Sequence, residues 1–459
     1  MECITVLLCS TETKKELKKF KDFIFKILQT TKLCLEQNDQ ENLKICLESI
    51  QDLSLSQPNI LRKNFNDIFI LMGKIIEEKN LEDIIREICF EVLASLIDKN
   101  PKILSDNNLL IFLQSLFKYS MEIDQIIDKE RVTPNSVSFI SDEFIPENKL
   151  DETCSILSRL FEAKGEGKMV QITIKNIIEL INHSNEKDWK YKYIAYISIA
   201  EIIHFIKDLN SIENLISLII KDLNNKNLKI QYATLYCIAK LSDAHNPNFQ
   251  NIYHKKVVPE IIKILSSSNC LRVQWICCNA LERFIEHMTN VDASLYMKDS
   301  LENLFNVFMR NEKECPSSLK EGILYVLQEF IDASEEEFKK YSDKCLQLLL
   351  QYLGEILCKN INSNLIGPLI ETISYIGPLC PELFKKHLKV ITKILIQINL
   401  NLTNFTGNLA HYLLSTWEKI IPYLKKADSE VVPKIIDSLL ELLKKIQKCQ
   451  YQIMSKKSI

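Results

Sequence analysis

Three acidic residues occupy the same place in three similar stretches of the sequence. Thirteen positions after the start of each stretch stand Asp243, Glu286 and Asp332. A row of carboxylates suits the lysine and arginine side chains of an extended basic peptide, because charge-assisted hydrogen bonds are the stronger kind and adjacent like charges raise the local field. A solvated helix face would carry the same residues. The sequence therefore leaves two interpretations of this row, a peptide-binding site or a bare acidic surface.

Each acid lies beside an apolar stripe that predicts an amphipathic helix. The stretches begin at Ile230, Val273 and Leu319, which gives a repeat of 43 to 46 residues. Counted from these starts as zero, positions 0, 7, 8 and 11 are apolar in all three, and such offsets share one face of an α-helix. Apolar segments at 257–265 and 301–309 precede the second and third stretches, so each repeat is predicted to be a pair of helices. The stripe residues are Ile230, Cys237, Ile238, Leu241, Val273, Ala280, Leu281, Phe284, Leu319, Val326, Leu327 and Phe330.

The repeat extends over most of the chain. Its 459 residues exceed the ~250–300 at which a single core stops growing. The period is that of HEAT or armadillo repeats, whose helix pairs bury their apolar faces only by stacking on one another. Helices joined by short polar loops need little glycine, and the chain has only eight. We therefore predict an all-α fold, an α-α superhelix of about nine or ten HEAT-like or armadillo-like helix pairs.

Composition and motifs argue against an enzyme, a cofactor or metal site, and a nucleic-acid or membrane partner. The formal net charge is −3, so no strong basic field exists for nucleic acid, and no stretch approaches the ~18 apolar residues of a membrane span. The fifteen cysteines form no CxxC pair, which predicts buried, reduced thiols. The GEGK run at 165–168 lacks the spacing of a phosphate loop, and GxSxG and HExxH motifs are absent. The apolar run at 4–9 is short for a signal peptide, so we expect the protein in the cytoplasm and nucleus.

One stretch, at 123–152, interrupts the helical periodicity. It contains Pro134 and Pro146 and has eight acidic against three basic residues. A long irregular loop inside a compact array is usually functional or disordered, and a tolerated insertion is the alternative. We predict four regions: HEAT-like repeats at 1–122, an acidic irregular loop at 123–152, further HEAT repeats at 153–425, and a terminal helix with a polar tail at 426–459.

From Trp189 onward the chain carries an ordered series of short segments. They are WKYKY at 189–193, KIQYA at 229–233, NPNFQ at 246–250, HKKV at 254–257, RVQ at 272–274, ASEEEF at 333–338, YSD at 341–343, ETISYIG at 371–377 and LSTW at 414–417. This series resembles the importin-beta superfamily, in its karyopherin-beta-3 branch. The match is good over 187–380 and weaker to Lys425, and before residue 120 it rests on helix-pair spacing alone. Family members are much longer, so the resemblance covers their central part, and the chain is either a gene fragment or a shortened paralogue.

The resemblance implies a nuclear transport receptor. In that family, inner-surface residues of the second helices bind cargo, which implies a cargo-binding role for Asp243, Glu286 and Asp332. An acidic insertion at the place of the 123–152 loop contacts the GTPase Ran, which implies Ran contacts near Asp142, Glu143 and Glu147. The expected partners are cargo proteins with basic signals, Ran and nuclear pore proteins.

A rival interpretation comes from a different functional class. A HEAT-repeat scaffold or adaptor subunit, without any response to Ran, would show the same helical repeats. A third possibility is a receptor that has lost its coupling to Ran and keeps only its cargo or nuclear-pore contacts. Nucleotide-dependent binding of Ran separates the first interpretation from the other two.

Overall fold

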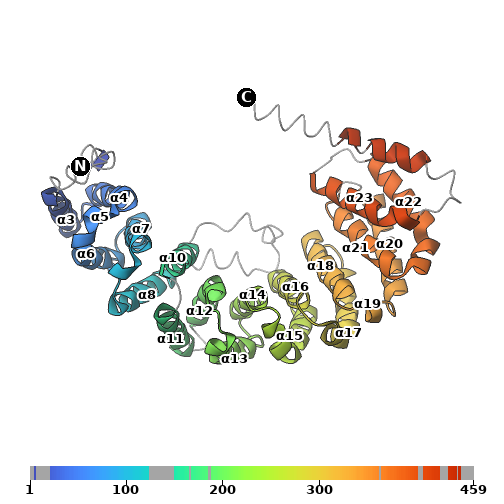
Figure 1. Ribbon diagram of the computed structural model, residues 1–459, viewed down its shortest axis with the longest axis horizontal. Helices are drawn as coiled ribbons and strands as arrows, with labels where there is room; N and C mark the ends of the chain where they lie inside the picture. Colours follow the sequence, from blue (N-terminus) through green and yellow to red (C-terminus); the bar gives the residue numbers. More distant parts are fainter. Residues whose placement is uncertain are drawn as a thin grey trace. The chain divides into compact units, whose positions relative to one another are not determined.

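The computed structural model describes residues 5–6, 21–122, 149–164, 167–183, 188–360, 363–401, 407–423, 433–441 and 443–445. Their contacts divide them into two compact units, of which the first ends at His245 and the second begins at Asn246. Both units are built from pairs of helices, which are drawn as labelled ribbons in Figure 1. The predicted all-α, helical-repeat fold is thus confirmed.

The first unit contains five helix pairs among its described residues. Its first helices are α3 (Lys21–Glu36), α6 (Phe65–Glu77), α8 (Asp106–Ser120), α11 (Lys168–His183) and α13 (Glu213–Asp222). Its second helices are α4 (Gln40–Ser56), α7 (Asp83–Lys99), α10 (Lys149–Lys164), α12 (Trp189–Ile202) and α14 (Leu228–Ala244). Each second helix packs against the second helix of the next pair, so these helices form a layer of their own (Figure 1).

The second unit repeats this arrangement. Its first helices are α15 (Asn248–Ser267), α17 (Asn290–Phe308), α20 (Ser342–Lys359) and α22 (Pro381–Asn401). Its second helices are α16 (Leu271–Ile285), α18 (Ser317–Ala333), α21 (Ile366–Leu379) and α23 (Gly407–Ile420). Contacts of α16 with α18, α18 with α21 and α21 with α23 again form one layer, which we call the second-helix layer of this unit.

Short helices connect these pairs. They are α5 (Pro58–Leu61), η2 (Arg62–Asn64), η3 (Pro101–Ile103), η6 (Ile203–Phe205), η7 (Leu209–Ile212), α19 (Glu335–Phe338) and η8 (Ile421–Tyr423), and residues 433–441 and 443–445 are helical as well. Helix α10 begins at Lys149, inside the range expected to be an irregular loop. Among the described helices, none has the length and apolar character needed to cross a membrane.

The predicted apolar stripe is the core of three second helices. All twelve of its residues are buried, from Ile230 at 5% exposure to residues such as Cys237, Phe284 and Phe330 at 0%. Burying such side chains contributes about 1.5–3 kcal/mol each. Because offsets 0, 7, 8 and 11 share one face, the stripe joins each second helix to its neighbours.

The fourth residue of some second helices closes the C-terminal end of the first helix before it. In α14, the side-chain amide of Gln231 donates to the carbonyl of Leu223 at 2.9 Å. In α16, Gln274 donates to the carbonyl of Leu265, also at 2.9 Å. The last carbonyls of a helix have no partner within the helix, so these amides satisfy groups that would otherwise be buried unpaired.

In two other helix pairs, a buried cation donates to the C-terminal carbonyls of the first helix in place of an amide. In α7, Nε of Arg86 donates to the carbonyl of Ile76 at 2.8 Å. In α18, Nζ of Lys320 donates to the carbonyls of Phe308 and Arg310. Arg86 is 3% exposed and Lys320 is 1% exposed. Positive charge at a helix C-terminus is also favoured by the helix dipole, so burial of these two cations is partly compensated.

Candidate functional site

Asp243 lies in the last turn of α14, in the second-helix layer of the first unit, and is half-buried. On the same helix the hydroxyl of Tyr236 donates to the carboxylate of Glu201 in α12 at 2.6 Å. The position is the one expected from the repeat. Asp243 belongs to a different unit from Glu286 and Asp332, and its surroundings are those of α12 and α14.

Glu286 and Asp332 lie in the second unit on adjacent helices. Glu286 is the C-cap residue of α16, with a side chain 53% exposed, and Nε2 of the neighbouring His287 is 3.9 Å from its carboxylate. Asp332 is exposed in the last turn of α18. Helices α16 and α18 pack against one another, so the repeat places these two carboxylates at corresponding ends of neighbouring helices.

Glu329, which the position-by-position alignment missed, lies among these acids. Burial, together with the negative charges of Glu286, Asp332 and Glu282, raises the pKa of its carboxyl to about 7. Glu329 stands three residues before Asp332, and residues i and i+3 are neighbours on a helix surface. That spacing was the signal available in the sequence.

Several acids of this layer lack a direct lysine or arginine partner among the described residues. Within the described residues, Glu329, Asp332 and Glu371 of α21 form no ion pair with a lysine or arginine. The first unit shows the opposite arrangement, because Arg159 of α10 binds Glu91 at 2.6 Å and Asp98 at 2.8 Å, both on α7. These carboxylates of the second unit can therefore accept a further positive charge.

Metal binding does not explain this cluster. No group of three or more histidine, cysteine, aspartate or glutamate side chains in the described part of the chain is arranged to hold a metal ion. The carboxylates are spread along the layer instead, which suits an extended ligand with several separate positive charges better than a single ion.

Tyrosines lie between the acids of the second unit. The hydroxyl of Tyr325 on α18 donates to Glu321 at 2.8 Å and lies 3.0 Å from the hydroxyl of Tyr412 on α23. The ammonium group of Lys419 on α23 lies over the ring of Tyr375 on α21, with Nζ 3.4 Å from the ring centroid. Aromatic faces and carboxylates both attract cations, so this layer offers two kinds of group to the same ligand.

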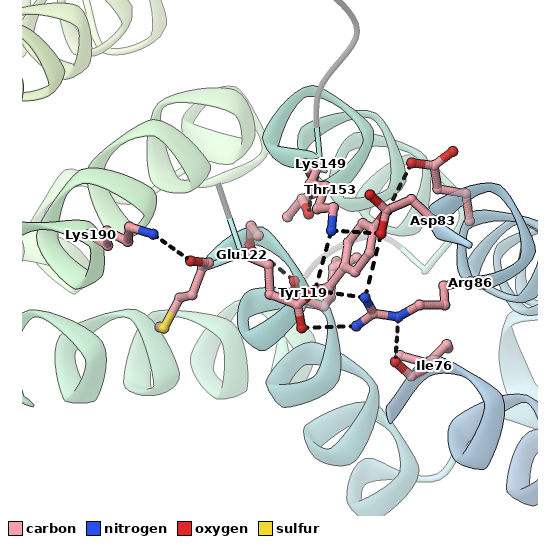
Figure 2. A network of polar contacts seen from close by, with 12 residues as sticks. Ile76, Asp83, Arg86, Tyr119, Glu122, Lys149, Thr153 and Lys190 are labelled. Carbon is pink, nitrogen blue, oxygen red and sulfur yellow. Dashed lines mark hydrogen bonds and ion pairs between the residues drawn. The ribbon is translucent and has the colours of Figure 1, made fainter. Parts of the chain in front are cut away.

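The residues expected to contact Ran, Asp142, Glu143 and Glu147, lie outside the described residues. Glu122 and Lys149, the described residues that flank this stretch, belong to one polar network (Figure 2). Arg86 binds both carboxylate oxygens of Glu122, at 2.6 and 3.0 Å. Lys149 contacts Glu122 at 3.2 Å and Asp83 at 2.7 Å.

This network is partly buried and ties α7, the end of α8 and the start of α10 together. The ring of Tyr119 lies 4.8 Å from Cζ of Arg86 and 4.9 Å from Nζ of Lys149. Although burial opposes ionisation of Glu122, the hydrogen bonds and charges of Arg86 and Lys149 outweigh it and lower the carboxyl pKa. Bidentate contacts of this kind are geometrically specific, so Glu122 and Lys149 are held side by side.

Known proteins share this architecture. Importin subunit beta-3 of Saccharomyces cerevisiae is 22% identical over 441 residues, which are 95% of this chain and 39% of the relative. The crystal structure of Kap121p matches with a TM-score of 0.78 and 22% identity over 94% of this chain and 41% of that one. Kap121p bound to Pho4p gives the same values, and Kap121p bound to Nup53p gives a TM-score of 0.78, with 40% of that chain covered. The predicted resemblance to the importin-beta superfamily is confirmed.

The similarity has a defined extent. No family model matches the chain, and the structural matches, at 22% identity, establish the fold. The chain spans about two fifths of the length of these importin-type relatives. Its similarity reaches well beyond the 187–380 range of the best sequence match, because the helix pairs before it superpose as well.

Proposed function

We propose that this chain is part of a nuclear transport receptor that binds cargo proteins through their basic segments. The observation that carries the proposal is a set of acids in the second-helix layer of the second unit that form no ion pair with a lysine or arginine among the described residues: Glu286, Glu329, Asp332 and Glu371. The complexes of Kap121p with Pho4p and with the protease Ulp1p support it, since that relative binds other proteins. We propose the cytoplasm and nucleus as the locations.

Neighbouring carboxylates in this layer repel one another, and this repulsion raises the pKa of Glu329. A bound lysine-rich segment would reduce the repulsion, because its positive charges lie between the carboxylates. Each charge-assisted contact at a partly exposed surface is worth about 0.5–1 kcal/mol, so affinity depends on several contacts along the layer. The negative potential of these acids also speeds association with a positively charged partner, because opposite charges steer encounters.

The test is charge reversal of the predicted row. We expect Asp243→Lys, Glu286→Lys and Asp332→Lys together to weaken binding of a fluorescent lysine-rich peptide by roughly tenfold or more, measured by anisotropy. Binding of the unmodified protein should also weaken as salt increases. The matched control reverses three exposed acids of first helices, Glu213, Asp299 and Asp343, and should leave the affinity nearly unchanged.

Two results would contradict the proposal. If both triple variants lose affinity equally, only the overall charge matters and the row is a solvated surface. If the unmodified protein shows no salt-sensitive binding to the peptide, the acids do not serve a basic ligand.

We further propose that Ran regulates cargo binding and that the 123–152 stretch contributes to the contact through Asp142, Glu143 and Glu147. This proposal rests on the family resemblance and on the acidity of that stretch. The complex of Kap121p with Nup53p supports nuclear pore proteins as further partners.

A further inference from the structure

The ammonium group of Lys419 occupies an unusual place in the second-helix layer. It rests on the face of the Tyr375 ring, 3.4 Å from the centroid, well inside the ~6 Å at which a cation and an aromatic ring attract one another. The contact joins α23 to α21, which pack together. Both side chains are partly exposed, so solvent and a ligand can reach the same place.

The charges of nearby carboxylates act on this ammonium group. Burial lowers the pKa of Lys419, while the charges of Glu371 on α21 and Asp332 on α18 favour its charged form. Burial raises the pKa of both carboxyls, and the positive charge of Lys419 reduces that increase. Within the described residues, Lys419 forms no ion pair with either carboxylate. The cation is therefore attracted by the carboxylates of Glu371, Asp332 and Glu418, but the ring of Tyr375 is the group it contacts directly.

We propose that Tyr375, Asp332 and Glu371 form a subsite for a lysine side chain, and that Lys419 fills it until a lysine of the bound peptide displaces it. This inference rests on the proposed function and adds a specific occupant and a competitor to it. Lys419 acts as the competitor because its own ammonium group is already seated where the ligand's would be.

Displacement of Lys419 is physically accessible. The lysine side chain is a flexible four-carbon stem with a strongly hydrated head, and a cation on a partly exposed ring is held only weakly. An incoming lysine regains the same ring contact and the same carboxylates. Lys419 consequently reduces affinity without blocking binding.

The experiment removes the competitor. Lys419→Met should bind an alternating lysine–alanine peptide roughly three- to tenfold more tightly than the unmodified chain, measured by anisotropy or calorimetry. Lys419→Arg, which keeps a cation on the ring, should bind like the unmodified chain. Lys393→Met is the matched control, because Lys393 is exposed on α22 outside the layer and its loss changes the net charge equally.

A second variant separates a subsite from a general charge effect. Tyr375→Leu in the Lys419→Met background should abolish the gain, whereas Tyr375→Phe, which keeps the ring, should retain it. Equal or weaker binding by Lys419→Met overturns the inference, as does a gain that persists with Tyr375→Leu or appears in Lys393→Met. Peptide binding by the unmodified chain with no change in Lys419→Met removes this inference alone. Absence of binding in every variant removes the proposed function with it.

Discussion

At the scale of single residues, the acids of the second unit are defined more by their neighbours than by their own identity. Glu329 and Asp332 are common surface residue types, yet burial and adjacent carboxylates raise both pKa values. The repeat alignment found Asp332 because it compares equivalent positions. It missed Glu329, and it gave no sign of Lys419 on Tyr375, because such contacts cross between helices far apart in the sequence.

Glu329 makes binding of a basic peptide depend on pH. A bound cation favours the ionised carboxylate, so binding releases a proton when the pKa is about 7, and affinity should increase as pH rises from 6 to 8. We expect a two- to fivefold increase that Glu329→Gln lacks, of the order expected for one partly exposed charge contact. Peptide titrations at three pH values measure it. The same pH profile in both proteins would show that Glu329 takes no part.

The same residue affects stability with a definite sign. Because the folded-state pKa of Glu329 is raised above its usual value, the folded state holds this proton more tightly. The favourable contribution is therefore present at low pH and is lost as pH rises through about 7. Glu329→Gln should raise the free energy of unfolding at pH 8 by about 1 kcal/mol and change it little at pH 4, as measured by urea titration.

At the scale of helices, the buried stripe was predictable and the polar closures were not. Apolar residues at fixed offsets identify a helix face regardless of what covers it. Gln231, Gln274 and Lys320 each directly follow the first stripe residue of their helix. From the sequence alone, a polar residue at this position is expected to be exposed to solvent. Its burial depends on a hydrogen bond to a carbonyl at the end of the preceding helix, which the aligned stretches do not contain.

Gln274 offers a test of these closures. Replacing it with methionine keeps the approximate volume but leaves the buried carbonyl of Leu265 without its donor. An unpaired buried group costs about 1–3 kcal/mol, so Gln274→Met should lower the urea midpoint clearly. Gln351→Met, at an exposed position of α20, should stay within about 0.5 kcal/mol of the unmodified chain. Similar losses in the two variants would mean that the hydrogen bond of Gln274 contributes nothing specific.

Helix α10 shows where sequence patterns reach their limit. Its first turn was expected to be part of the irregular loop, because acidic residues and two prolines dominate the stretch before it. Lys149, the first residue of the helix, contacts Glu122 and Asp83, and neither contact can be predicted from local propensity. The boundaries predicted for the four regions remain predictions.

At the scale of the whole molecule, the helical-repeat architecture followed from one periodicity, while the function depends on which partners recognise it. The chain shares its fold with Kap121p, of which it covers 41%. A repeat solenoid binds through extended surfaces, and the fold alone does not choose between a receptor and a scaffold.

Ran discriminates between these two functions. We expect the immobilised chain to retain Ran loaded with GTP several-fold better than Ran loaded with GDP, and replacement of Asp142, Glu143 and Glu147 by their amides to reduce this retention, because the contact depends on their charge. The measurement is a pull-down quantified for both nucleotide states. Equal retention of the two forms, or none, would favour a scaffold or a receptor without Ran coupling.

The polar network around Arg86 has a consequence for engineering. The side chains of Glu122 and Lys149 are in contact, so the two ends of the intervening chain are held near one another, and the entropy of closing such a loop grows only slowly with its length. A foreign domain whose own termini are adjacent can be grafted between these two residues with little strain on α8 and α10. The solenoid thus contains a natural attachment point for a reporter.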